Sequence, residues 1–111
     1  MFTGSDKLAN DLSRCSMVQQ DPIWRLPLWS GYQDDLNSRV ADLNNIPDHR
    51  YAGAITAALF LQAFVSNPET WVHFDIMGWN TTDLPGRPLG GEALSMRTLD
   101  AFIARRYSET V

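Results

Sequence analysis

Apolar residues near the start of the chain follow a helical period. Leu8, Leu12 and Cys15 recur three or four positions apart, which predicts an amphipathic helix with one apolar stripe. Ser5 can cap the start of this helix, because its side-chain oxygen can accept a backbone N–H of the first turn. We expect the helix to end at Asp21–Pro22, since the residue before a proline is disfavoured in helical geometry.

The following stretch has no long periodic run. Residues 23–29 are mostly apolar, but they contain Pro27, which cannot donate a ladder hydrogen bond, so we predict an edge strand or an extended segment. A short helix is expected over residues 32–37. Residues 40–45 fit either a strand or a turn, and residues 47–50 form a polar loop.

The longest apolar stretch runs from Tyr51 to Val65 and predicts a helix over residues 52–65, with Thr56 and Gln62 as its only polar residues. A helix that is apolar on nearly all sides is normally buried around most of its circumference. Residues 71–76 are short and rich in aromatic and β-branched side chains, so they predict a strand.

The predicted strand leads into Gly78, and ligands in α/β proteins gather where strands end, so this run resembles the rim of a pocket. Residues 81–91 contain two Pro and three Gly and predict a loop, and residues 94–107 predict a final amphipathic helix. One strand among four helices cannot form a sheet alone. Its partners must come from a longer chain, from another protomer or from other segments of this chain.

Composition places the 111 residues in one soluble globular domain, spanning residues 1–111, with 44% hydrophobic and 20% charged residues. A net charge of −4 argues against a nucleic-acid partner. The 15-residue apolar stretch is too short to cross a membrane, and no signal peptide is visible at the N-terminus. The single Cys15 excludes an internal disulfide and fits a reducing compartment, so we expect a cytoplasmic protein.

Few titratable residues suggest chemistry. His73 and Asp75 are two positions apart and would share one face of the predicted strand. Two groups do not make a site, and we expect them to have structural roles, because buried polar groups are usually hydrogen-bonded. We expect His49 to be solvated in its polar loop, and Asp34 and Asp35 to form an exposed helix face.

Several separated segments together resemble the leucyl (cytosol) aminopeptidase family. The segments that carry this resemblance are residues 24–28, 38–46, 51–65, 71–78 and 87–99. The resemblance covers nearly the whole chain and places it at the C-terminal end of the family's α/β catalytic domain. It implies mostly helices packed around one or few strands of an incomplete sheet.

Family enzymes are di-metal exopeptidases that remove N-terminal residues from peptides. The resemblance implies two divalent ions, Zn or Mn, held by carboxylates and a lysine in two upstream motifs that do not occur in this sequence. The most similar string, residues 80–87, lacks the required Glu and follows the predicted strand. We therefore expect this chain to contain no catalytic residue, no metal ligand and no bound cofactor.

Part of the substrate pocket is carried over by the resemblance. Ile46 would line the leaving-group side of the pocket, and Asn80 would lie on its wall. Met77 stands where the family usually has Ala on the wall that contacts the N-terminal side chain of the peptide. A larger side chain at this position predicts a narrower or shifted pocket.

The sequence thus predicts the C-terminal portion of a di-metal leucyl aminopeptidase, which supplies scaffold and part of the substrate pocket but is inactive alone. Peptides would be the substrate of the complete enzyme. The alternative is a non-catalytic packing or oligomerisation module. The family forms hexamers, so the resemblance also implies a homo-oligomer.

Overall fold

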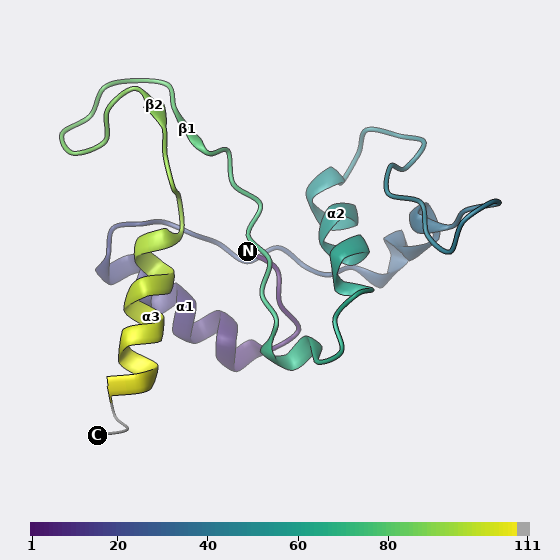
Figure 1. Cartoon of the computed structure of the whole chain (residues 1–111), viewed down its shortest axis with the longest axis horizontal. Coiled ribbons are helices and arrows are strands. Elements are labelled where there is room, and N and C mark those ends of the chain that lie inside the picture. Colours follow the sequence, from purple (N-terminus) through teal and green to yellow (C-terminus); the bar gives the residue numbers. More distant parts are fainter. Residues whose placement is uncertain (109–111) are drawn as a thin grey trace. The chain divides into compact units, whose positions relative to one another are not determined.

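The computed structural model describes residues 1–108, which form three α-helices, two 3₁₀ helices and one small sheet (Figure 1). In chain order the elements are α1 (Asp6–Val18), η1 (Ser30–Leu36), α2 (Gly53–Gln62), η2 (Pro68–Thr70), β1 (Trp79–Asn80), β2 (Gly90–Gly91) and α3 (Met96–Ser108). The chain divides into two compact units, one made of residues 1–9 and 25–73 and the other of residues 10–24 and 74 onward. The prediction of a single domain stays a prediction.

The first unit is organised around the N-terminal residues, which lie between two other extended segments. Phe2 and His73 exchange backbone hydrogen bonds of 2.8 and 2.9 Å in an antiparallel bridge. On the other side, the Leu26 N–H donates to the Met1 carbonyl at 3.0 Å, and the Thr3 hydroxyl donates to the Trp71 carbonyl at 2.7 Å. The predicted extended segment around Pro27 is therefore confirmed.

The strand predicted at residues 71–76 is present only as extended backbone with one bridge, at His73. Its partner is the N-terminus of the same chain, a segment to which the sequence pattern assigned no role. The His73 ring stacks with the rings of both Phe2 and Trp71, with centroid distances of 5.9 and 6.2 Å. Phe2 is fully buried. His73 thus has the packing role expected of it.

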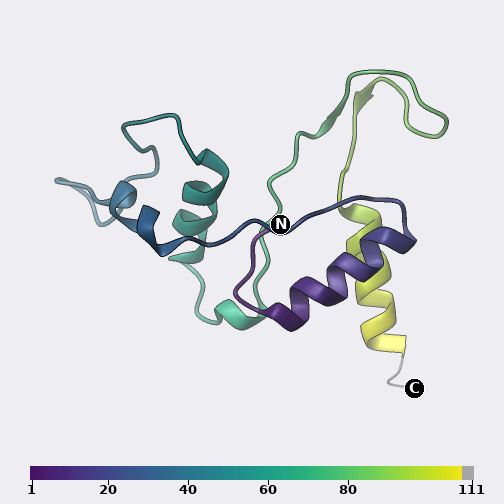
Figure 2. The same ribbon diagram turned by 180° about the vertical axis from the view of Figure 1, so that it is seen from behind.

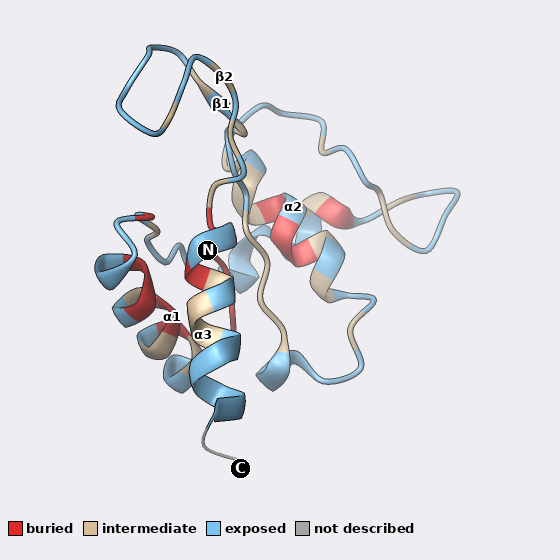
Figure 3. Ribbon diagram, turned by 60° about the vertical axis from the view of Figure 1, so that its left-hand side comes forward, coloured by how far each residue is buried: buried red, intermediate tan, exposed pale blue. Residues whose placement is uncertain are grey.

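Helix α2 packs against η1 in the first unit, where Leu36, Ala58 and Leu59 are buried. The expectation that α2 is buried around most of its circumference is met in part. Its exposed residues, Gly53, Ala57 and Leu61, form one stripe, and the others are buried or half-buried, red or tan in Figure 3. Leu61 is 41% exposed, and Phe64, just beyond the helix, is 69% exposed. The described residues of the unit therefore leave one stripe of this apolar helix uncovered.

The segment that joins η1 to α2 consists of bends, which decides the open choice at residues 40–45 in favour of turns. The Ser38 hydroxyl accepts the N–H groups of Val40 and Ala41 at 3.3 and 3.1 Å. Such local side-chain bonds offer the backbone an alternative to strand pairing. The helix predicted at residues 32–37 is the 3₁₀ helix η1.

In the second unit, the C-terminal half of α1 lies beside α3 in both Figure 1 and Figure 2. Leu12 and Cys15 of the predicted apolar stripe are buried. The end of α1 is set by Asp21, whose N–H donates to the Ser16 carbonyl at 3.0 Å. No helix within residues 1–108 is long and apolar enough to span a membrane.

Asp21 also caps α3, although 74 residues separate it from that helix's start. Its Oδ1 accepts the Ser95 N–H at 3.0 Å, and its Oδ2 accepts the Thr98 N–H at 3.1 Å. The Thr98 hydroxyl donates to the Asp21 carbonyl at 3.1 Å. Asp21 is 2% exposed. A carboxylate at this position satisfies orphan N–H groups of the first turn and favours the positive end of the helix dipole.

Residues 81–91 were predicted to be a loop, and residues 81–89 are the loop that joins the two arms of a hairpin, β1 and β2. Trp79 pairs with Gly91 and Asn80 pairs with Gly90, in antiparallel register. Gly90 has a φ of 125°, a conformation that residues with a side chain rarely adopt. The loop composition was therefore recognised, but its last two residues close a sheet.

Asp21→Ala should lower the free energy of unfolding by about 2–4 kcal/mol, because it leaves two buried N–H groups of α3 without acceptors. Urea denaturation followed by circular dichroism measures this change. Asp6→Ala is the matched control, since it removes an 86% exposed carboxylate paired with Arg25. The control should cost under about 1 kcal/mol. Equal urea midpoints for the two variants would contradict the capping role of Asp21.

Candidate functional site

Met77 and Asn80 lie on one continuous segment that leaves the extended run and enters β1. Met77 is 67% exposed, and Asn80 is half-buried. Between them, Gly78 has a φ of 67°, and its carbonyl accepts the Glu92 N–H at 3.1 Å. The left-handed conformation at Gly78 turns the chain into the hairpin and leaves the Met77 side chain exposed.

The Asn80 side chain is engaged within the hairpin. Its amide nitrogen donates to the Pro88 carbonyl at 3.1 Å and to Glu92 Oε2 at 2.8 Å. Both donors of the amide are therefore used to hold the two arms together. Asn80 therefore stabilises the conformation of the hairpin that follows Met77.

Ile46 belongs to the first unit, whereas Met77 and Asn80 belong to the second. It is 70% exposed, and its N–H donates to Asn44 Oδ1 at 3.3 Å. The Asn44 N–H in turn donates to the Leu36 carbonyl of η1 at 2.7 Å. Ile46 is thus an exposed apolar side chain on a turn that is fastened to η1. The assignment of all three residues to one substrate pocket stays a prediction.

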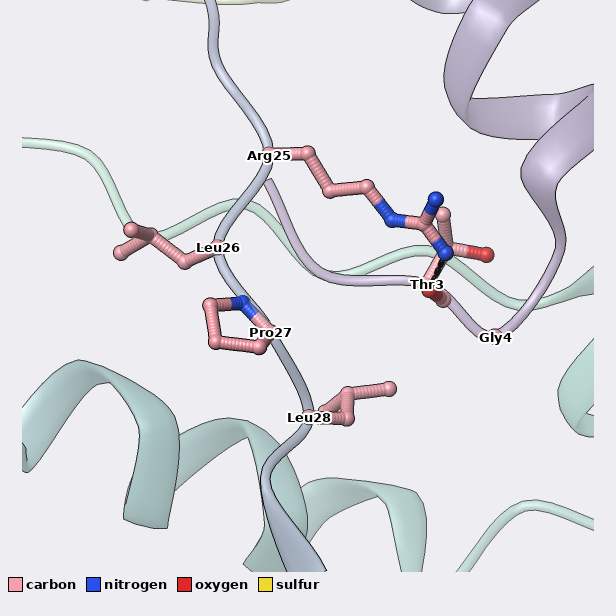
Figure 4. Close-up of a pocket in the computed structure, with 6 residues that line it drawn as sticks. All are labelled: Thr3, Gly4, Arg25, Leu26, Pro27 and Leu28. Atoms are coloured by element: carbon pink, nitrogen blue, oxygen red, sulfur yellow. Dashed lines mark hydrogen bonds between the residues drawn. The ribbon is translucent and has the colours of Figure 1, made fainter.

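The first unit has an open groove of about 500 Å³ (Figure 4). Its lining residues are Thr3, Gly4, Arg25, Leu26, Pro27 and Leu28. Arg25 donates to Asp6 Oδ1 at 2.6 Å and to the Thr3 carbonyl at 2.9 Å. The guanidinium therefore fastens the chain after α1 to the start of that helix. None of the three predicted pocket residues lines this groove.

Residues 1–108 contain no group of three or more His, Cys, Asp or Glu side chains placed to hold a metal ion. Asp75 is exposed, and His73 stacks with two aromatic rings. The described side chains thus do not fit a di-metal centre. That the chain binds no metal stays a prediction.

Asp35 differs from expectation because it is half-buried, whereas Asp34 and His49 are exposed as expected. The side chain of Asp35 is 23% exposed and that of His49 is 39% exposed, and Asp35 Oδ2 lies 3.1 Å from His49 Nε2. Sequence reasoning missed this pair, because the two residues stand in different elements and neither carries a local signal for the other.

The sequence profile of the cytosol aminopeptidase family, catalytic domain, matches residues 1–99. The chain belongs to the cytosol aminopeptidase family. The match confirms the predicted α/β class and the assignment to the C-terminal part of the catalytic domain.

Individual relatives agree with this assignment. A probable cytosol aminopeptidase of Prochlorococcus marinus is 41% identical over 101 residues, which is 89% of this chain and 20% of that protein. A probable cytosol aminopeptidase of Chlamydia caviae is 49% identical over 78 residues, 69% of this chain and 15% of that protein. The chain thus spans about a fifth or less of the length of these relatives.

Solved structures give the same result. The cytosol aminopeptidase of Coxiella burnetii superposes with a TM-score of 0.88 at 52% identity, covering 96% of this chain and 23% of that one. The bottromycin maturation enzyme BotP, solved in complex with Mn, gives a TM-score of 0.85 at 35% identity, covering 95% and 24%.

Asn80→Ala should loosen the β1–β2 hairpin, because it removes both side-chain bonds that join its arms. We expect amide hydrogen exchange at Glu92 to rise about 3- to 10-fold, the result of losing about 1 kcal/mol of local stability. NMR-detected exchange measures this change. Glu92→Gln keeps an acceptor oxygen for the Asn80 amide and serves as the control. Unchanged exchange in Asn80→Ala would show that backbone pairing alone holds the hairpin.

Proposed function

We propose that this chain supplies scaffold and part of the substrate pocket of a metal-dependent aminopeptidase that releases N-terminal amino acids from peptides. The observation that supports this most strongly is the family match over residues 1–99, in a chain that covers 20% of its relative from Prochlorococcus marinus. The relatives are named as cytosol enzymes, and a cytoplasmic location belongs to the same proposal.

The chain's own contribution is to bind and orient the substrate. Met77 and Ile46 are exposed apolar side chains, as a wall that contacts an apolar peptide side chain requires. Met77 has a longer side chain than the Ala usual in the family, so the pocket for the N-terminal side chain is narrower or shifted. Asn80 holds together the hairpin that follows Met77 and so helps to orient the segment that carries Met77.

The metal chemistry lies outside this contribution. The two divalent ions of a family enzyme polarise the scissile carbonyl and activate water, and they need several converging ligands. The described side chains offer no such set. The chain by itself is therefore inactive, and its activity depends on a metal-bearing remainder of the catalytic domain.

The purified chain should not release fluorophore from a leucine amide substrate, because the converging ligands of a di-metal centre are missing from its described residues. The assay is run with added Mn²⁺ or Zn²⁺, with a complete cytosol aminopeptidase as the positive control. Metal-dependent turnover by this chain, abolished by a chelator, would overturn the proposal that it is inactive alone.

A second candidate function is a non-catalytic packing or oligomerisation module. It is favoured by large apolar side chains that are exposed at the end of α2, just beyond it and on the hairpin. These side chains include Leu61 (41% exposed), Phe64 (69%), Trp79 (54%), Leu84 (56%) and Leu89 (59%). Large exposed apolar patches commonly mark surfaces that associate with another protein.

Size-exclusion chromatography with light scattering separates the two candidates. The packing module should elute as an oligomer, because association buries the exposed apolar side chains. Phe64→Ser and Leu84→Ser should shift the oligomer toward the 12.5 kDa monomer. Thr81→Ser, on the same hairpin, is the matched control. A monomer at all concentrations that unfolds in one cooperative step would argue against the packing module.

A further inference from the structure

The Ile46 turn is connected to η1 and to the backbone just before α2 through one side chain, His49. On one side, the Nδ1 of His49 accepts the Tyr51 N–H at 3.2 Å, two residues before α2 begins. On the other side, its Nε2 lies 3.1 Å from Asp35 Oδ2 in η1. The imidazole therefore contacts η1 and the backbone of Tyr51, the residue at which the chain approaches α2.

The Asp35 oxygen makes this contact significant. Oδ2 is shielded from solvent and has no aligned hydrogen-bond partner among the described residues. A buried carboxylate oxygen without a partner is costly, since it loses its hydration. The Nε2 of His49, 3.1 Å away, is the polar group at ion-pair distance from this oxygen among the described residues.

The two contacts fix the tautomer of the neutral ring. Because Nδ1 accepts the Tyr51 N–H, the proton of the neutral imidazole must be on Nε2, the nitrogen that lies 3.1 Å from Asp35 Oδ2.

The charged residues around the ring are few. Asp34 accepts a hydrogen bond from Asn37 at 3.3 Å and is exposed, as are Asp48 and Arg50 beside His49 in the loop. Within residues 1–108, Asp35 is the carboxylate at ion-pair distance from the ring. Tyr51 lies on the other side, with its ring centroid 6.0 Å from that of the imidazole.

We propose that Asp35 and His49 are positioning residues that hold the Ile46 turn against η1, an inference that rests on the proposed role of Ile46 as a wall of the substrate pocket. The same turn is fastened to η1 by the Asn44 N–H, which donates to the Leu36 carbonyl at 2.7 Å. Two fastenings at either side of Ile46 restrict where its side chain can lie. The pair would thereby determine which leaving groups fit beside Ile46.

Two substitutions of His49 separate its two contacts. Asn places an acceptor near the position of Nδ1 and can keep the bond from the Tyr51 N–H, as in an Asx turn, but it cannot reach Asp35. Gln places its amide near the position of Nε2 and can reach Asp35, but it loses the acceptor for Tyr51. The two variants are matched in charge and chemistry and differ in which contact survives.

Amide hydrogen exchange of the 111-residue chain, read by NMR, tests the proposal. We expect exchange at Asn44 and Ile46 to rise about 3- to 10-fold in His49→Asn and Asp35→Ala and to stay near the unsubstituted rate in His49→Gln. At Tyr51 the order should reverse, with faster exchange in His49→Gln.

Equal exchange at Asn44 and Ile46 in all variants would overturn the proposal, as would equal loosening by His49→Asn and His49→Gln. Should Asp35→Ala fail to fold, the comparison of the two His49 variants still decides. The measurement follows the turn and not catalysis. An exchange pattern other than the expected one therefore refutes the positioning role alone. A separate finding that Ile46 does not line the substrate pocket would leave the exchange pattern unchanged.

Discussion

The buried carboxylate of Asp21 is the constraint on which the second unit depends. A carboxylate at 2% exposure is stable only when its oxygens are satisfied, and here the Ser95 and Thr98 N–H groups satisfy both. The same two bonds cap the N-terminus of α3, where Ser95 has a φ of 70°. One residue thus ends one helix and starts another 74 positions away. A cap from a distant residue links local helix formation to the tertiary structure of its unit.

The first unit depends on a comparable long-range contact. Phe2 is fully buried and pairs through its backbone with His73, so the N-terminal residues form the centre of a minimal sheet. Each flanking segment contributes little regular structure of its own. Pro27 prevents one of them from donating at that position, and the other forms a single bridge. Aromatic stacking of Phe2, His73 and Trp71 supplies the packing that so short a ladder does not.

The sequence predicted what depends on neighbouring residues and missed what depends on distant ones. The periods of Leu8, Leu12 and Cys15 located α1, and Pro27 correctly predicted an extended segment, because both signals act locally. The cap by Asp21 and the pairing of Phe2 carry no local signal, since a carboxylate before proline and an apolar residue near an N-terminus are compatible with many partners. The exposed stripe of α2 was missed for a related reason, because apolar composition does not show which residues cover the helix. For the candidate site, the positions of Ile46, Met77 and Asn80 came from family resemblance, whereas the Asp35–His49 contact required the structure.

The character of the candidate site sets the limits of what this chain can do. Ile46 and Met77 offer apolar surface, and the donors of Asn80 are used within its own hairpin. Such groups discriminate between substrates by size, where one methylene changes binding by about 1–3 kcal/mol. They cannot polarise a carbonyl or activate water, because these steps need charge that converges on the reacting atoms. Under the proposed function, Met in place of the usual Ala would act on specificity through the volume of the pocket. The turn of Ile46 and the hairpin after Met77 are each fixed by side-chain hydrogen bonds or ion-pair contacts. If these two segments form the pocket wall as proposed, a change in those contacts would alter specificity without touching the reaction centre.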